Sequence, residues 1–173
     1  MALVQDFLNT RPTGSGGQDL LTDLDSARSW LDSAVAEWAS QTNRKLDPPE
    51  IAMHDVVGLR ELRSAIESLI DGEALSAELL THPAEIALTN VGQLRLEPVG
   101  IGWRWLASAL VGEILLAQRA DTWKHLKLCR NPYCHTAFYD RTKNGNGVWH
   151  DVKTCGNSAN LRASRARRRK QPD

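Results

Sequence analysis

Three cysteines and one histidine near the C-terminus form the most informative pattern in this sequence. Cys129, Cys134, His150 and Cys155 follow the spacing C-x4-C-x15-H-x4-C. Thiolate and imidazole groups at such spacing suit tetrahedral Zn²⁺, for which a set of three cysteines and one histidine is sufficient. Protein atoms would then fill every coordination position. We therefore predict one structural zinc ion per chain rather than a catalytic one.

Two other histidines lie close to this pattern and are weaker candidates for the fourth ligand. His135 is adjacent to Cys134, and neighbouring side chains rarely point the same way. His125 precedes the first cysteine and would have to fold back. Three reduced cysteines without a metal remain the alternative to a zinc site. A disulfide framework is disfavoured, because the cysteines are odd in number and all lie within positions 129–155.

Short elements must bring these ligands together. Residues 130–133 form a tight turn between the first two cysteines, and residues 138–149 contain an Asn-Gly signal that predicts a hairpin. A helix is expected from Gly156 onward, with Cys155 at its start. The segment has few apolar residues, so zinc should supply much of its folding free energy. In comparable modules that contribution is on the order of 10–16 kcal/mol.

The expected C-terminal helix carries a stripe of arginines. Arg162, Arg165 and Arg169 share one face, and Arg168 lies beside them. The planar guanidinium group suits phosphate oxygens and guanine edges. A disordered, solubilising tail is the alternative interpretation. We predict that the residues contacting nucleic acid are Asn157, Arg162, Arg165, Arg168, Arg169 and Lys170.

The charge distribution divides the chain into two parts. Residues 121–173 hold 12 Lys/Arg and 4 Asp/Glu, a net charge of +8, whereas residues 1–120 hold 9 and 17, a net charge of −8. This asymmetry predicts two modules, residues 1–120 and residues 121–173, with different partners. The basic part matches the electrostatics of a polyanion binder. Attraction between the two parts, within one chain or across a dimer, is the alternative.

The first module reads as a small helical domain with a minor β element. Apolar residues at helical spacing, Trp30, Trp38, Trp103 and Trp105 among them, predict a packed core. Alternation predicts a strand or hairpin arm at 93–97. The expected helices begin at Asp25 as N-cap, run from Pro49 to Ile70, cover about 73–89 with an interruption at His82-Pro83, and span 102–119.

Several classes of protein are disfavoured by what the sequence lacks. No apolar run approaches the roughly 20 residues that span a bilayer, so no membrane partner is expected. The N-terminal residues do not form a signal peptide, which makes a cytoplasmic location the expectation. The sequence contains no nucleophile elbow, P-loop, HExxH or dinucleotide fingerprint. We therefore do not expect an enzyme.

The residues around the proposed ligands resemble the CGNR zinc finger family, which is named for a Cys-Gly-Asn-Arg motif. The resemblance rests on Cys129, Cys134, Phe138-Tyr139-Asp140, Trp149 and Cys155-Gly156-Asn157. Residues 6–11 (DFLNTR) and 59–63 (LRELR) are similar to the helical domain that precedes this finger in bacterial proteins. The resemblance thus extends over nearly the whole chain.

This resemblance implies a treble-clef-like finger and a role in transcription. Members of the family are regarded as stress-induced transcriptional regulators of bacteria, with the finger as the DNA-binding part. Their usual ligands are four cysteines, and the third follows the tryptophan directly. Here that position is His150, and Ser158 replaces the arginine of the motif.

The combined expectation is a mainly α chain with a minor β element, followed by a small α+β zinc finger. Its expected function is that of a bacterial transcription regulator in which zinc braces a DNA-contacting helix. The alternatives are a zinc-braced protein-interaction adaptor and an RNA-binding module that stacks bases on Tyr133 and Tyr139. The first module is compatible with a small-molecule effector and with a homodimer.

Overall fold

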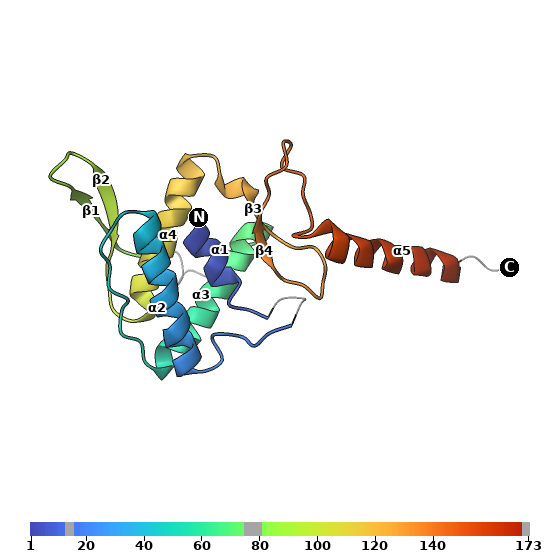
Figure 1. Ribbon diagram of the computed structural model, residues 1–173, viewed down its shortest axis with the longest axis horizontal. Helices are drawn as coiled ribbons and strands as arrows, with labels where there is room; N and C mark the ends of the chain where they lie inside the picture. Colours follow the sequence, from blue (N-terminus) through green and yellow to red (C-terminus); the bar gives the residue numbers. More distant parts are fainter. Residues whose placement is uncertain (13–15, 75–80, 171–173) are drawn as a thin grey trace.

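The computed structural model describes residues 1–12, 16–74 and 81–170, without the side chains of Ala166 and Lys170. Figure 1 shows a body of four helices, α1 to α4, with a two-stranded hairpin projecting at one end. A second small sheet lies against the body, and helix α5 extends away from it toward the C-terminus. The hairpin and the basic helix therefore occupy opposite ends of the molecule.

Eleven short and long elements follow one another in the described chain. They are α1 (Ala2–Leu8), α2 (Leu24–Gln41), α3 (Met53–Asp71), β1 (Ala84–Leu88), β2 (Leu94–Pro98), α4 (Trp103–Arg119), a 3-10 turn (Trp123–His125), β3 (Leu126–Leu128), β4 (Ala137–Tyr139), a π-helical turn (Val152–Gly156) and α5 (Asn157–Lys170). Strands β1 and β2 pair antiparallel, as do β3 and β4. This arrangement confirms the predicted mainly α fold with a minor β element.

The hydrophobic core lies where α1 to α4 meet. Phe7, Leu59 and Leu110 are fully shielded from solvent, and the predicted core residues Trp30 and Trp38 are 8% and 4% exposed. The same cluster includes Leu126 of β3 and Ala137 of β4. The β3–β4 sheet of the zinc region therefore packs into the same core as the helices, and burial of apolar surface joins the sheet to the helical body.

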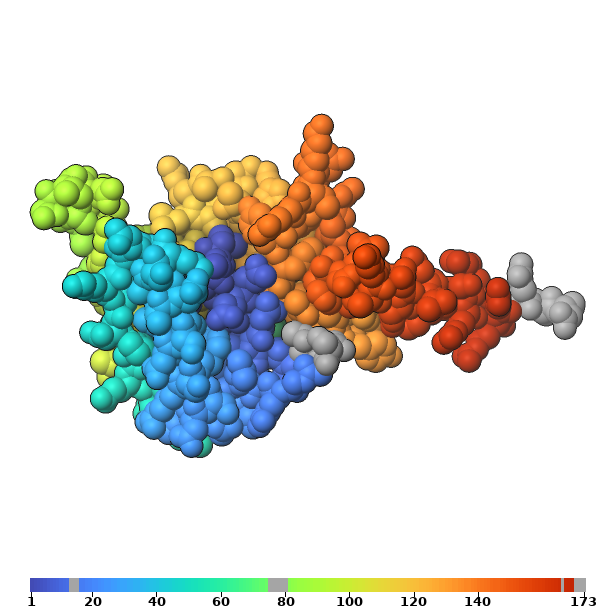
Figure 2. Space-filling view, in the orientation of Figure 1, coloured from blue at the N-terminus to red at the C-terminus, as the bar shows by residue number. Residues whose placement is uncertain are grey.

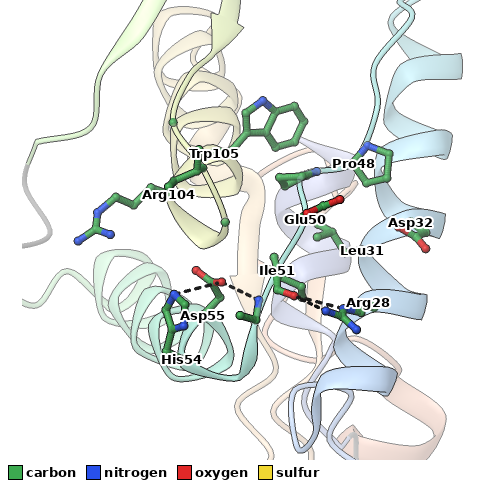
Figure 3. A pocket seen from close by; sticks show the side chains of 15 residues that line it. Arg28, Leu31, Asp32, Pro48, Glu50, Ile51, His54, Asp55, Arg104 and Trp105 are labelled. Atoms are coloured by element: carbon green, nitrogen blue, oxygen red, sulfur yellow. Dashed lines mark hydrogen bonds and ion pairs between the residues drawn. The ribbon is translucent and has the colours of Figure 1, made fainter.

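One buried carboxylate fixes the starts of two helices. Asp55, which is 6% exposed, accepts hydrogen bonds from the backbone N–H of Ala52 at 2.8 Å and of Trp103 at 3.1 Å. These groups lie at the N-termini of α3 and α4, where backbone donors lack helical partners. Asp55 lies beside His54 (Figure 3). Both residues line an open hollow of about 1040 Å³ between α2, the loop before α3 and the start of α4.

The helix predictions were accurate except at three places. Helix α3 begins at Met53, so residues 49–52, which were predicted as its first turn, are not helical. Helix α2 begins at Leu24, and its N-cap is Asp23, not Asp25, because the Asp23 side chain accepts from the Ser26 backbone N–H at 2.8 Å. The helix predicted over 73–89 is wrong: residues 84–88 form β1 and pair with β2, and the described residues 73–74, 81–83 and 89 are not helical. Its residues 75–80 lie outside the described part of the chain.

Among the described residues, no helix combines the length and hydropathy needed to cross a membrane.

Candidate metal centre and basic helix

A two-stranded knuckle presents the first two cysteines. Cys129 follows β3 and Cys134 precedes β4, and the backbone N–H of Cys129 donates to the carbonyl of Thr136 at 2.9 Å. A second bond, from the N–H of Cys134 to the carbonyl of Asn131 at 2.9 Å, closes the turn between them. The predicted tight turn is confirmed. It holds both thiols on one side of the sheet end.

The other two ligands come from the segment that enters α5. The Asp151 carboxylate accepts hydrogen bonds from the backbone N–H groups of Lys153 at 2.7 Å and Thr154 at 3.3 Å, which starts the π-helical turn. This turn carries Cys155 inward, while His150 lies just before it. Trp149 and Phe138 pack against the three cysteines. An apolar cover of this kind keeps water away from the sulfur atoms.

The four predicted ligands converge on one point. One ligand atom from each of Cys129, Cys134, His150 and Cys155 lies within 4.8 Å of the other three. The His150 Nδ1 is 3.2 Å from the Cys134 Sγ and 3.6 Å from the Cys155 Sγ. A tetrahedral zinc with Zn–S of about 2.3 Å and Zn–N of about 2.0 Å requires sulfur–nitrogen separations of about 3.5 Å. The donor set and its spacing therefore fit one zinc ion.

The structure brings His150 rather than the rival histidines into this group. His135 has a positive φ of 55° and is exposed. His125 directs its Nδ1 to the carbonyl of Asp140 at 3.0 Å and packs against Tyr139. Because His150 fills the fourth position, the donor set of the site is three sulfurs and one nitrogen.

The electrostatics of the cluster also call for a cation. Burial raises the pKa of the Cys129 thiol to about 11, although hydrogen bonds from the backbone of Asn131 and His150 oppose that rise. Three buried sulfurs at such separations cannot all be ionised unless a positive charge lies among them. A zinc ion would supply that charge, because thiolates are its normal ligands.

Asn131 and Arg162 connect this cluster to the C-terminal helix. The Asn131 amide, 8% exposed, donates to the Cys155 Sγ at 3.2 Å. The Arg162 guanidinium donates to the Asn131 Oδ1 at 3.0 Å and to the Ser158 hydroxyl at 2.7 Å, and it lies 5.3 Å from the centre of the Tyr133 ring. Sequence reasoning missed Asn131, since an asparagine inside a turn is unremarkable. Its contacts define a path from a ligand to α5.

The predicted hairpin over 138–149 is wrong. Only its first residues form a strand, β4, and that strand pairs with β3. Residues 140–147 instead wrap around the buried Asp140, which accepts from the backbone N–H of Thr142 at 2.9 Å and of Gly147 at 2.7 Å. Lys127 donates to the Asp140 carboxylate at 2.7 Å and to the carbonyls of Gly145 and Gly147. A side-chain ion pair thus replaces the expected backbone ladder.

Helix α5 is highly charged and mostly exposed. Asn157, Arg165, Arg168 and Arg169 are exposed, whereas Arg162 is half-buried against the knuckle. The side chain of Lys170 lies outside the described part of the chain. Within the part that is described, no acidic side chain forms an ion pair with the arginines at 165, 167, 168 or 169. In Figures 1 and 2 the helix stands clear of the body.

The side chain of Asn9 joins the zinc region to the helical body, because it pairs with backbone groups of β4 as a neighbouring strand would. The Asn9 amide donates to the carbonyl of Ala137 at 3.0 Å, and its Oδ1 accepts from the N–H of Ala137 at 2.8 Å. This reciprocal pair occupies the backbone N–H and carbonyl of Ala137, the first residue of β4, and ties them to the end of α1. The orientation of the finger is therefore fixed relative to the four helices.

Two family profiles match the chain. The profile described as "CGNR zinc finger" matches residues 125–168. The ABATE profile, described as "Putative stress-induced transcription regulator", matches residues 1–124, which is well over half of the chain. Both parts of the expected resemblance are confirmed. No curated protein matches the chain.

Proposed function

The chain belongs to the ABATE family and ends in a CGNR zinc finger, and we propose that it acts by binding duplex DNA through α5. The observation that carries this proposal is the set of exposed arginines on a helix that begins at the metal centre. We assign phosphate or base contact to Arg165, Arg168 and Arg169, with Asn157 and Lys170 at the two ends. Contact with chromosomal DNA would make the protein cytoplasmic.

Arg162 has a different role in this proposal. Its guanidinium is directed at Asn131 and Ser158 inside the chain, so we assign it to positioning α5 on the knuckle rather than to reading DNA. The motif arginine that Ser158 replaces is thus matched by a guanidinium from one helical turn further along. The RNA-binding alternative keeps one of its two stacking rings, because Tyr133 is 72% exposed beside Arg162, whereas His125 packs on Tyr139.

The zinc ion has a structural role in this proposal. Four protein ligands leave no coordination position for water or substrate, so the finger has no Lewis-acid chemistry to offer. We propose that residues 121–173 form the DNA-contacting unit and residues 1–120 the regulatory or dimerising unit. The two units share one hydrophobic core, which would fix the direction of α5 relative to α1–α4, the helices that would receive a signal.

Duplex binding measured as a function of salt tests the proposal. Each phosphate contact lowers the slope of log K against log salt by about 0.9, so Arg165→Ala and Arg169→Ala should each make the slope shallower by about one. Arg167→Ala is the matched control, because it removes the same charge from another side of the same helix. Equal losses in all three variants, or none in any, would contradict the proposed face. Selection of genomic DNA fragments by the zinc-loaded protein would then report the preferred sequence.

A further inference from the structure

Strand β1 forms an open edge of the molecule. The hairpin stands out from the helical body as a knob (Figure 2), and β2 packs against α4 more extensively than β1 does. Strand β2 ends at Pro98, which has no N–H to donate. Strand β1 contains neither proline nor lysine, two residues by which edge strands commonly avoid pairing. The outer edge of β1 is therefore suited to accept another strand.

The hydrogen-bond pattern of the hairpin shows which backbone groups face this edge. The N–H of Thr89 donates to the carbonyl of Gln93 at 2.8 Å, which makes these two residues a bonded pair of the ladder. Bonded and non-bonded pairs alternate between antiparallel strands, so residues 87 and 85 also bond to β2. The N–H and carbonyl groups of Ala84, Ile86 and Leu88 therefore point to the open edge.

One face of the hairpin carries two charges that lack a partner of their own. Among the residues that the structure describes, neither Glu85 nor Arg95 forms an ion pair. Glu85 lies directly opposite Glu97, whose carboxylate is bound by Arg44, and like charges in that arrangement repel. The half-buried Arg95 lies opposite Ala87, which presents only a methyl group. A strand added beyond Ala87 would come within reach of Arg95.

We propose that β1 pairs with β1 of a second copy of this chain, antiparallel and centred on Ile86, to form a four-stranded sheet. This register pairs all five residues of β1, with Ala84 opposite Leu88 of the second copy and Ile86 opposite Ile86. The groups that point to the open edge then meet their equivalents and form about six backbone hydrogen bonds. A two-fold axis relates the copies, as in most homodimers.

The same register brings the two unpaired charges together. Glu85 of the second copy falls opposite Ala87, and Arg95 lies on the other side of that alanine. The two backbones are then separated by two strand spacings of about 4.8 Å, which the long arginine and glutamate side chains span across the methyl group. Centring the pairing on Ala87 would instead place Glu85 opposite Thr89 and lose this contact. Strand overlap and charge complementarity therefore select one register, and the two-fold axis repeats the contact.

Exposed apolar side chains on the other face of the hairpin fit this arrangement. Ile86 and Leu88 are 73% and 68% exposed, and alternate residues of a strand share one face. In the four-stranded sheet they lie beside their equivalents from the second copy, on the face where Leu96 approaches Gly112 of α4. Burial of this apolar surface would add to the backbone pairing. The inference does not depend on DNA binding by α5.

Sedimentation equilibrium of the full zinc-loaded chain, run over a range of concentrations, tests the proposal. We expect a species of twice the 19.2 kDa chain that dissociates on dilution. Glu85→Arg and Arg95→Glu should each weaken dimerisation by about tenfold or more, because both symmetric contacts become repulsions. The two substitutions in one chain exchange the charges and should restore the dimer. Glu61→Arg, at an exposed residue of α3, is the control for the change in net charge and should leave dimerisation unchanged.

A backbone variant tests the strand pairing separately from the charges. Ile86→Pro removes an N–H that points to the open edge and that β2 does not use, so the hairpin should persist while the dimer is lost. The helical circular dichroism spectrum and the zinc content should stay those of the wild type. A chain that is monomeric at every concentration, or a dimer that survives Ile86→Pro, would overturn the proposal. Charge variants that behave like Glu61→Arg, or a double variant that dimerises no better than the single ones, would overturn it as well.

Discussion

Replacing Arg162 by alanine separates the two roles that an arginine on α5 can have. The substitution removes the hydrogen bonds to Ser158 at 2.7 Å and to Asn131 at 3.0 Å, together with the contact on Tyr133. The Asn131 Oδ1 is then left with only the backbone N–H of Tyr133 at 3.4 Å. Because Asn131 donates to the Cys155 Sγ, the loss reaches a metal ligand.

The size of the effect follows from those contacts. Hydrogen bonds from a charged donor contribute about 1.5–3 kcal/mol each when buried. Arg162 is half-buried, so solvent screening reduces the total to about 1–2 kcal/mol. These contacts of Arg162 form only when the knuckle and α5 are assembled around the metal site. Zinc affinity should therefore fall by about 5- to 30-fold, since about 1.4 kcal/mol corresponds to a factor of ten.

Competition with a chromogenic zinc chelator measures this loss, and salt-dependent DNA binding completes the comparison. At saturating zinc, Arg162→Ala should keep nearly the wild-type salt slope, because no phosphate contact is lost. Arg167→Ala, which removes the same charge without a described partner, should keep wild-type zinc affinity. An Arg162→Ala variant with unchanged zinc affinity and a salt slope shallower by about one would refute the bracing role and return Arg162 to the DNA-contacting set.

Three further predictions follow from the contacts described. Cys155→Ser should abolish binding of the single zinc ion and expose residues beyond 140 to protease, while α1 to α4 stay folded, as metal analysis and limited proteolysis would show. Asn9→Ala should lower the free energy of unfolding by about 2 kcal/mol in chemical denaturation, since it removes two bonds to Ala137; an unchanged midpoint would rule out that link. Asp19→Asn should cost about 2–3 kcal/mol at neutral pH, because the buried Arg63 loses its carboxylate partner.

The Asp19 prediction carries a pH dependence with a definite sign. Burial raises the pKa of Asp19, but the hydrogen bonds from Arg63 and from the Leu21 backbone N–H, together with the positive charges of Arg63 and Arg11, outweigh it, and the pKa is lowered overall. A lowered pKa stabilises the fold above the ordinary value of about 3.9, and that stability is lost as the pH falls below it. The difference between wild type and Asp19→Asn should therefore shrink below about pH 4. A constant difference down to pH 2 would contradict the ion pair.

Patterns set by a single physical rule could be predicted from the sequence. Ligand spacing identified Cys129, Cys134, His150 and Cys155, because zinc chemistry limits both the donor type and the loop length between donors. Helical spacing identified α2, α3 and α4, whose buried faces repeat over several turns. Helix α1 was not predicted, because its seven residues are too few to show a helical period. Its four buried residues are buried only through contacts with other elements.

Features set by tertiary contacts could not be predicted in this way. The Asn-Gly signal at 144–145 indicates a turn but not the pairing of strands, and Asp140 with Lys127 organised that loop instead. Ile86 and Leu88 fit either a helix or a strand until β2 lies opposite them. Arg162 shares a helical face with Arg165, yet the position of Asn131 turns its guanidinium inward. Each of these outcomes depends on residues that are distant in the sequence.

The central claim, that zinc braces a DNA-contacting helix, is tested most directly by duplex binding with and without zinc. Fluorescence anisotropy of a labelled duplex should show tight binding by the zinc-loaded chain, with a log–log salt slope of about −3 to −4 for contacts from the three arginines and Lys170. Removal of zinc by chelation should weaken that binding by at least about tenfold, and added zinc should restore it. Equal binding by the zinc-loaded and zinc-free protein, or no salt-dependent binding by either, would contradict the account.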